Sequence, residues 1–171
     1  MKHSMAKTIL ITGASNGIGG QLAREFAAKG YNLALAARTE SKLAALKAEL
    51  QQSHANIKIE VASLDVNNLP SVAVAIEQFA TSFNGLDIII ANAGIGDGGG
   101  PIGSGGFAKD ADIIQTNVLG AMATIDAAVA LFKRQKHGQV VAISSVAAAR
   151  GLPGTGSYSA SKAAIARSVR A

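Results

Sequence analysis

The stretch that most constrains the fold lies near the N-terminus, where an apolar run leads into a glycine-rich turn and then a helical pattern. Residues 7–11 read Lys-Thr-Ile-Leu-Ile, which is typical of a strand buried on both faces. Residues 12–19 are rich in glycine, and residues 21–29 carry apolar side chains at helical spacing. Glycine lets a backbone approach a pyrophosphate closely, and the free N–H groups of a helix start face the anion. The pattern therefore favours a phosphate cradle over an ordinary tight turn.

The alternation of strand and helix is repeated along the chain. Apolar runs typical of strands lie at residues 32–36, 57–62, 87–91 and 139–144. Helical periodicity lies at residues 40–51, 69–83 and 110–133. Alternating units of this kind build a parallel sheet with right-handed crossovers. The sequence therefore predicts an α/β fold with a doubly wound parallel sheet.

Length and composition narrow the class of protein. The chain has 171 residues, of which 49% are hydrophobic, so it can bury one sizeable core and is expected to form a single domain over residues 1–171. It has no apolar run of about eighteen residues, the length that a membrane span needs. Cysteine is absent, which excludes disulfides, thiolate metal ligands and a thiol nucleophile. We expect a cytoplasmic protein without a metal site or a membrane partner.

The net charge of +5 raises the possibility of nucleic-acid binding. The densest basic group is Lys133, Arg134, Lys136 and His137, which closes a predicted helix, where cations complement the helix dipole. Tyrosine and phenylalanine are few and tryptophan is absent, so the chain offers little for base stacking. We therefore expect no nucleic-acid partner, and the charge suits an anionic cofactor.

A pair of residues near the C-terminus has the spacing of a proton-transfer site. Tyr158 and Lys162 are four residues apart in a run of helix formers, so their side chains share one helix face. A free phenol has a pKa of about 10, and a neighbouring cation favours the phenolate. Such a tyrosine can exchange protons near neutral pH. Without support from other motifs, the pair would be an ordinary amphipathic coincidence.

Several motifs together resemble those of the short-chain dehydrogenase/reductases. The glycines Gly13, Gly17 and Gly19 follow the family's Gly-x-x-x-Gly-x-Gly spacing, and Tyr158 and Lys162 match its Tyr-x-x-x-Lys pair. The family's Asn-Asn-Ala-Gly signature is matched by Asn92, Ala93 and Gly94, with Ala91 in place of the first asparagine. Ser145, thirteen residues before Tyr158, resembles the family's catalytic serine. The resemblance covers essentially the whole chain.

The resemblance implies a Rossmann-like fold with strand order 3-2-1-4-5 and a reversible hydride transfer between a nicotinamide and a carbonyl or alcohol carbon. Tyr158 would be the proton donor or acceptor, Lys162 would favour the phenolate and bind the nicotinamide ribose, Ser145 would orient the substrate oxygen, and Asn117 would support a proton relay. The implied catalytic residues are Asn117, Ser145, Tyr158 and Lys162. The implied cofactor-binding residues are Gly13, Ser15, Asn16, Gly17, Ile18, Gly19, Arg38, Asp65, Asn92, Ala93, Gly94, Tyr158 and Lys162. A small-molecule substrate and a homodimer or homotetramer are also implied.

The end of the second strand indicates which nicotinamide cofactor is bound. An acidic residue at this point accepts hydrogen bonds from the adenosine ribose and would repel a 2′-phosphate. The chain has no acid there but has Arg38, whose planar guanidinium suits a phosphate. We therefore expect NADP in preference to NAD, with a solvated loop arginine as the alternative. The family resemblance implies that Asp65 contacts the adenine amino group. The alternative is that Asp65 caps a helix or forms a turn.

Two rival functions and one question of length stay open. The first rival is a nucleotide-sugar epimerase, which also uses a Tyr-x-x-x-Lys pair. The second is a non-catalytic fragment that binds NADP or serves as a scaffold. The sequence stops at Ala171, inside the helix expected to begin near Tyr158, whereas members of the family continue through further strands. We therefore expect a fragment of a longer protein, incomplete at its C-terminal end, or a surface completed by another chain.

Overall fold

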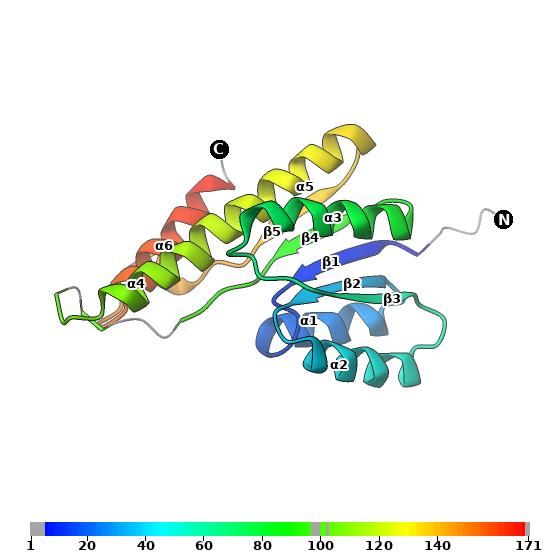
Figure 1. The fold of residues 1–171 in the computed structure, drawn as a ribbon, viewed down its shortest axis with the longest axis horizontal. Helices are drawn as coiled ribbons and strands as arrows, with labels where there is room; N and C mark the ends of the chain where they lie inside the picture. Colours follow the sequence, from blue (N-terminus) through cyan, green and yellow to red (C-terminus); the bar gives the residue numbers. More distant parts are fainter. Residues whose placement is uncertain (1–5, 97–99, 102, 170–171) are drawn as a thin grey trace.

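The computed structural model describes residues 6–96, 100–101 and 103–169, and its centre is one parallel sheet (Figure 1). The five strands are hydrogen-bonded in the order β3-β2-β1-β4-β5. Their bounds are Thr8–Thr12 for β1, Asn32–Ala37 for β2, Ile59–Ser63 for β3, Ile88–Ala91 for β4 and Gln139–Ala142 for β5. All neighbouring strands run parallel. The predicted fold class and strand order are confirmed.

The apolar runs form strands because the sheet is covered on both faces. β1 is buried along its whole length and pairs with β2 on one side and β4 on the other. Successive β1 side chains point to opposite faces, so Ile9 and Ile11 join one apolar cluster and Leu10 joins the other. A strand buried on both faces has no polar side, which explains the continuous apolar pattern.

Helices cover the two faces of the sheet as separate layers (Figure 1). Helices α1 (Gly17–Ala28) and α2 (Glu40–Ser53) pack on one face, where Ala23 and Leu43 belong to the same cluster as Ile9. Helices α3 (Leu69–Phe83) and α5 (Ala121–Gln135) pack on the other face. The first helix begins at Gly17, four residues before the expected start, because the Gly20 amide already donates to the Asn16 carbonyl.

The long helix predicted at residues 110–133 has an irregular centre. It consists of α4 (Phe107–Ile114), a π-helical segment η1 (Gln115–Gly120) and α5, which follow one another without a break. A π-helical turn holds an extra residue and is common at functional sites. By length and composition the helix 107–135 could cross a membrane, but core helices of soluble proteins share this property. The helix packs against α3, β4, β5 and α6 (Gly156–Ser168).

The last helix is shorter than expected. A short 3₁₀ helix η2 (Val146–Ala148) follows β5, and α6 then ends at Ser168, with Val169 as its C-cap. We expected the helix to continue to Ala171, but Val169 is no longer helical, so this expectation is wrong at that residue. Residues 170–171 lie outside the described part. At the helix end the Ser168 hydroxyl donates to the Ala164 carbonyl, a side-chain bond that competes with the backbone ladder.

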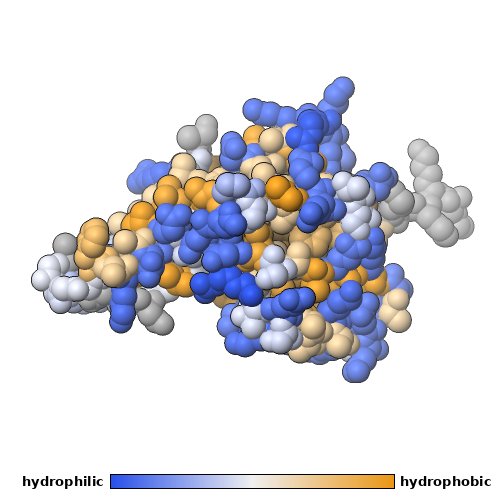
Figure 2. Space-filling view, viewed as in Figure 1, coloured by the Kyte–Doolittle hydropathy of each residue, from blue (hydrophilic) through white to orange (hydrophobic). Residues whose placement is uncertain are grey.

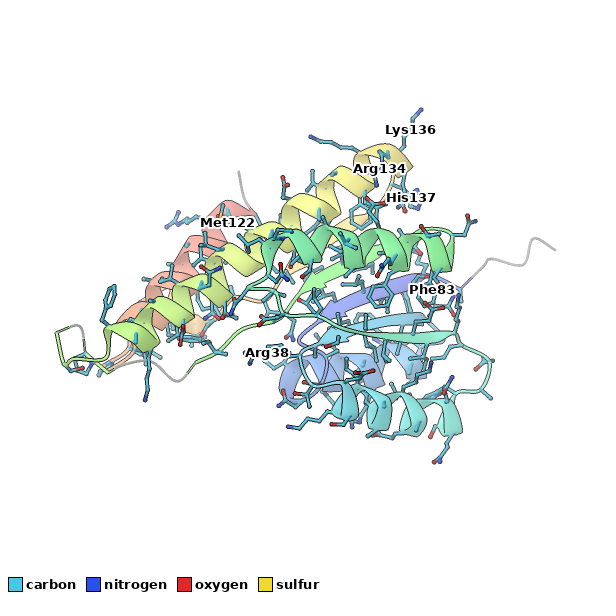
Figure 3. The ribbon with its side chains drawn as sticks, viewed as in Figure 1. Arg38, Phe83, Met122, Arg134, Lys136 and His137 are labelled. Atoms are coloured by element: carbon cyan, nitrogen blue, oxygen red, sulfur yellow. The ribbon has the colours of Figure 1, made fainter. Side chains whose placement is uncertain are left out.

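The basic group at the end of α5 lies where the sequence placed it. Lys133 and Arg134 are in the last turn, and Arg134, Lys136 and His137 gather at this end of the molecule (Figure 3). Arg134 forms an ion pair with Glu77 on α3. Apolar and polar side chains are interspersed over the face that α3, α4 and α5 present (Figure 2).

Candidate functional site

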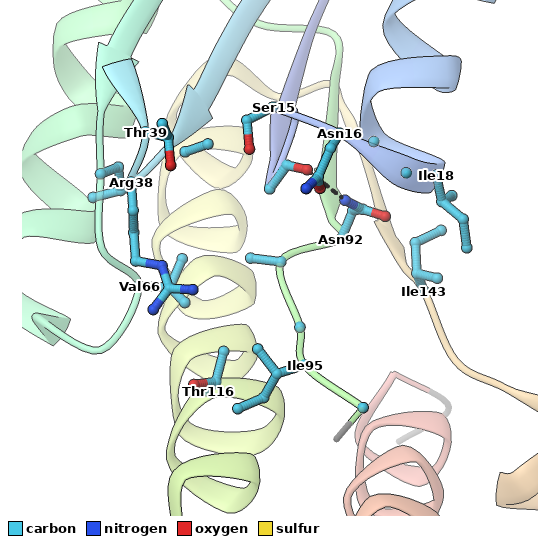
Figure 4. A pocket seen from close by; sticks show the side chains of 18 of the residues that line it. Ser15, Asn16, Ile18, Arg38, Thr39, Val66, Asn92, Ile95, Thr116 and Ile143 are labelled. Carbon is cyan, nitrogen blue, oxygen red and sulfur yellow. Dashed lines mark hydrogen bonds between the residues drawn. The ribbon is translucent and has the colours of Figure 1, made fainter. Parts of the chain in front are cut away.

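A cavity of about 560 Å³ opens at the carboxyl ends of the strands (Figure 4). Its walls come from the segments that follow β1, β2, β3, β4 and β5, and from helix α6. It lies at the end of β1, which has β2 on one side and β4 on the other. The order of the strands reverses direction at this point, so the connections that follow β1 and β4 lead to opposite sides. Ligands of open α/β sheets bind at such a switch point.

The glycine turn leaves no room for side chains at two positions. A Cβ atom on Gly19 would lie 2.4 Å from the Gly13 carbonyl oxygen, and one on Gly13 would lie 2.8 Å from the Ala93 Cα atom. Gly13 also has a φ of 68°, which glycine adopts without strain. The close packing brings the start of α1 against the end of β4 and leaves residues 15–19 along the cavity.

The start of α1 offers unpaired donors to the cavity. Asn16 is the N-cap residue, and its side chain makes no capping hydrogen bond. The first N–H groups of a helix have no partner within the helix, and they lie at the positive end of the helix dipole. Asn16, Gly17, Ile18 and Gly19 all line the cavity. This wall suits an anionic group.

The ends of β1 and β4 are joined by Thr12 and Asn92. The Asn92 side-chain amide donates to the carbonyl oxygens of Thr12 at 2.9 Å and of Gly13 at 3.2 Å. In return the Thr12 hydroxyl oxygen accepts from the backbone amides of Asn92 and Ala93. The bonds hold the glycine turn and the segment after β4 in one arrangement, with Asn92, Ala93 and Gly94 on the cavity wall.

One end of the cavity is basic. Arg38, which follows β2 directly, lines it beside Val66 from the loop after β3 (Figure 4). Lys42, in the first turn of α2, also lines the cavity. Asp65 lies in the same wall, and one of its carboxylate oxygens accepts from the Asn67 backbone amide at 3.0 Å. Asp65 therefore stabilises a turn, which was the alternative role expected from the sequence, and it also lines the cavity.

Asn117 connects three segments beneath the other end of the cavity. Its side chain is 1% exposed, accepts from the Ile95 amide at 2.8 Å and donates to the Ile95 carbonyl at 2.8 Å. It also donates to the Ser161 hydroxyl at 3.1 Å, and this hydroxyl donates to the Tyr158 carbonyl. The π-helical turn aims the amide at both partners. Asn117 thus links the segment after β4 to helix α6.

Tyr158 and Lys162 stand together on α6 and both line the cavity. The Lys162 Nζ atom lies 5.8 Å from the centre of the Tyr158 ring and donates to the Ile143 carbonyl oxygen at 2.9 Å. Lys162 is buried, and burial lowers the pKa of its ammonium from the ordinary value. Gly94 and Gly96 lie close by, so that a Cβ atom on Gly96 would be 3.8 Å from the tyrosine ring.

The two serines after β5 have different environments. Ser144 lines the cavity, and its hydroxyl donates to the Lys162 carbonyl oxygen at 3.0 Å. The Ser145 hydroxyl oxygen accepts from the Ala147 amide at 3.2 Å and so caps η2. Among the described residues, Ser145 and Asn117 do not line the cavity, although both adjoin residues that do.

The structure brings the implied cofactor-binding residues to one cavity, since all of them line it. Sequence reasoning missed other wall residues, namely Ala37, Thr39, Lys42, Leu64, Val66, Ile95, Gly96, Thr116, Ile143 and Ser144. Lys42 had a usable signal, because it is a second cation only four residues after Arg38. Thr116 had none, because its place depends on the π-helical turn.

The chain also matches known proteins over most of its length. The profile of the short chain dehydrogenase family matches residues 7–171. An uncharacterized oxidoreductase of Mycobacterium tuberculosis is 44% identical over 158 residues, which cover 92% of this chain and 62% of that protein. The chain therefore spans less than two thirds of this relative's length.

Two solved structures resemble the fold closely. The alcohol dehydrogenase from the archaeon Thermococcus sibiricus, complexed with 5-hydroxy-NADP, superposes with a TM-score of 0.90 at 33% identity, covering 96% of this chain and 69% of that chain. A short-chain dehydrogenase/reductase from Burkholderia phymatum in complex with NAD has a TM-score of 0.89 at 26% identity, covering 96% of this chain and 58% of that chain. With its sheet order, its glycine turn and a profile match over almost its whole length, the chain belongs to the short-chain dehydrogenase/reductase family.

Proposed function

We propose that this protein is an NADP-dependent oxidoreductase that transfers hydride reversibly between the nicotinamide and a carbonyl or alcohol carbon, with Tyr158 as the proton donor or acceptor. The observation that carries the proposal is a single cavity that has the glycine turn in its wall, Arg38 at one end, and Tyr158 with Lys162 in the wall that α6 supplies. The chain's family and its relatives' names as oxidoreductases and dehydrogenases support this reading. We also infer that residues 6–169 belong to a single cofactor-binding domain, because all five strands share one sheet.

The residues present fit a dinucleotide phosphate. The pyrophosphate would lie against the start of α1, where a side chain on Gly19 would collide with the turn and where the N-cap residue leaves backbone donors unpaired. Arg38 and Lys42 would bind the 2′-phosphate, because both cations line the cavity and lie four residues apart after β2. Asp65 would contact the adenine. The absence of an acid after β2 favours NADP over NAD.

The chain's own side chains would manage the proton. When bound, the cofactor supplies the hydride chemistry. In reduction, the Tyr158 phenol would give its proton to the substrate oxygen as negative charge develops there, and in oxidation it would accept the proton. Lys162 would stabilise the phenolate and bind the nicotinamide ribose, and Ser145 would hold the substrate oxygen. Asn117, which holds Ile95 and Ser161, would support the return of the proton from solvent.

The proposal is tested by NADPH oxidation against a panel of ketones and aldehydes. Wild-type protein should turn over at least one class of carbonyl, and Tyr158→Phe should lose turnover while it still binds NADPH. Binding is followed by cofactor fluorescence, because the chain has no tryptophan to interfere. Tight NADPH binding without turnover of any carbonyl would instead favour a non-catalytic NADP-binding protein.

We propose that the protein assembles as a homodimer or homotetramer through its long helices. The apolar residues Leu119, Met122 and Val129 of the continuous helix 107–135 are exposed. Their spacing of three and seven residues is that of side chains near one helix face. Large exposed apolar side chains that share one helix face are typical of interfaces. Light scattering after gel filtration should give a dimer or tetramer mass, and Met122→Lys should shift it towards the monomer. A monomeric wild type would contradict the assignment.

A further inference from the structure

A short hydrogen bond joins the starts of two helices close to the tyrosine. The Ser157 hydroxyl, in the first turn of α6, donates to Oδ1 of Asp110, in the first turn of α4, at 2.5 Å. Ser157 is 6% exposed and Asp110 is half-buried, so the bond is partly shielded from water. Hydrogen bonds from a hydroxyl to a carboxylate have about this length and are roughly twice as strong as neutral ones.

The start of α6 needs an external anchor. Its N-cap residue, Thr155, makes no capping hydrogen bond with its side chain. Among the described residues, the Thr155 hydroxyl bonds the Leu152 carbonyl and the Ser159 hydroxyl, which belong to the same loop and helix. The Asp110 carboxylate instead brings a negative charge from another helix to the positive end of the α6 dipole.

The second turn of α6 is held by other contacts. Ser161 accepts from Asn117, and Lys162 donates to the Ile143 carbonyl. Tyr158 lies between the two groups of contacts, one residue after Ser157, and its half-buried ring stands in the cavity wall. A shift of the first turn would therefore move the phenol relative to Lys162, whose own position is fixed from the second turn.

We propose that Asp110, acting through the Ser157 hydroxyl, is a positioning residue for Tyr158. The proposal rests on the proposed role of Tyr158 in proton transfer. Asp110 and Ser157 are not among the described residues that line the cavity, so their effect on the reaction is transmitted by the backbone of the first turn. The bond therefore affects the proton-transfer step and leaves intact the cofactor-binding walls that the glycine turn and Arg38 supply.

The activity test uses Asp110→Ala, Ser157→Ala, the double variant and Asp112→Ala as a matched control. Asp112 is an exposed acid on the same helix. Each single variant should lower kcat about ten-fold, with the Kd for NADPH within about two-fold of wild type, and the double variant should be no worse than either single one. Asp110→Asn should keep most of the activity, because its amide oxygen can still accept the bond. Asp112→Ala should behave like wild type.

Three results would overturn the proposal: an unchanged kcat in Ser157→Ala, additive losses in the double variant, or a parallel loss of NADPH affinity. Parallel loss would mean that the bond only maintains the fold. If Asp110→Ala does not fold, Ser157→Ala decides, because it removes a single oxygen atom.

A second measurement separates this proposal from the proposed function. The chain has only two tyrosines, so Tyr31→Phe leaves Tyr158 as the single tyrosine signal in a ring-labelled NMR spectrum. In this background, Ser157→Ala should shift the Tyr158 ring signals, and Asp112→Ala should not. If wild type turns over no carbonyl but the ring shifts, the function is wrong and the positioning holds. Unshifted ring signals in Ser157→Ala would refute the positioning, whatever the activity.

Discussion

The Lys162 ammonium donates a hydrogen bond to the Ile143 carbonyl oxygen at 2.9 Å and so joins helix α6 to the end of β5. The contact holds the cation inside the protein, beside the Tyr158 ring. Burial of the charge is unfavourable, and it lowers the pKa of the ammonium from the ordinary value of a lysine. Lys162 thus carries a cost in stability that depends on pH.

The first prediction concerns Lys162→Met. Because the native pKa is lowered, the folded state binds fewer protons than the unfolded state between that pKa and the unfolded value of about 10.4. Wild-type stability should therefore rise with pH in this window relative to Lys162→Met, which has no proton to lose. Urea unfolding of both proteins without cofactor, from neutral pH to about pH 10, measures the difference. A difference that does not change with pH, or that changes in the opposite sense, would contradict the assignment.

The second prediction concerns the glycine turn. Gly19→Ala would place a Cβ atom 2.4 Å from the Gly13 carbonyl oxygen and 2.5 Å from the Asn92 amide nitrogen. The turn must move, so we expect a loss of about 1–3 kcal/mol in stability and a large loss of NADPH affinity. Gly20→Ala is the control, because its nearest neighbour is at 3.4 Å. Equal behaviour of the two variants in thermal unfolding and cofactor binding would refute the close-packing argument.

The third prediction concerns cofactor choice. Arg38→Ala removes a guanidinium from the basic end of the cavity, so the KM for NADPH should rise about ten-fold while the KM for NADH changes little. Arg134→Ala removes the same charge at the far end of α5 and should leave both KM values unchanged (Figure 3). Steady-state kinetics with both cofactors measures the ratio. Equal losses for NADPH and NADH would show that Arg38 does not bind the 2′-phosphate.

The fourth prediction concerns the π-helical turn. Asn117→Ala removes the partners of the Ile95 amide and carbonyl, and each polar group left unpaired inside a protein costs about 1–3 kcal/mol. We expect a lower melting temperature and a loss of turnover. Gln115→Ala changes the same turn at a half-buried position and should cost much less. If the two variants lose equal stability, the Ile95 bonds contribute little.

Most of the fold could be predicted because its signals are local. The continuous apolar run of β1 follows from burial on both faces, and the leucines of α2 share one buried side of the helix. The lengths of elements were less accurate, as at α1, which begins in the glycine turn, and at α6, which ends at Ser168. Helix ends depend on which backbone groups find partners, and periodicity does not report this.

The candidate site was also only partly predictable from the sequence. The spacing of Tyr158 and Lys162 follows from helix geometry, and the structure places both in one cavity wall. Lys42 was missed, although it is a second cation only four residues after Arg38. The π-helical turn around Asn117 and the bond from Ser157 to Asp110 could not be predicted. Each depends on segments that are distant in the sequence, so no local spacing reports it.

The sequence by itself determined the order of strands and helices, the glycine turn and the pair on α6, because steric limits, helical periodicity and burial act within a few residues. Tertiary structure alone decided which polar groups meet: Asn117 with Ile95 and Ser161, Lys162 with Ile143, and Asp110 with Ser157. The physical reason is that buried polar groups must find partners, and the partners become available only when the sheet and its two helix layers have packed.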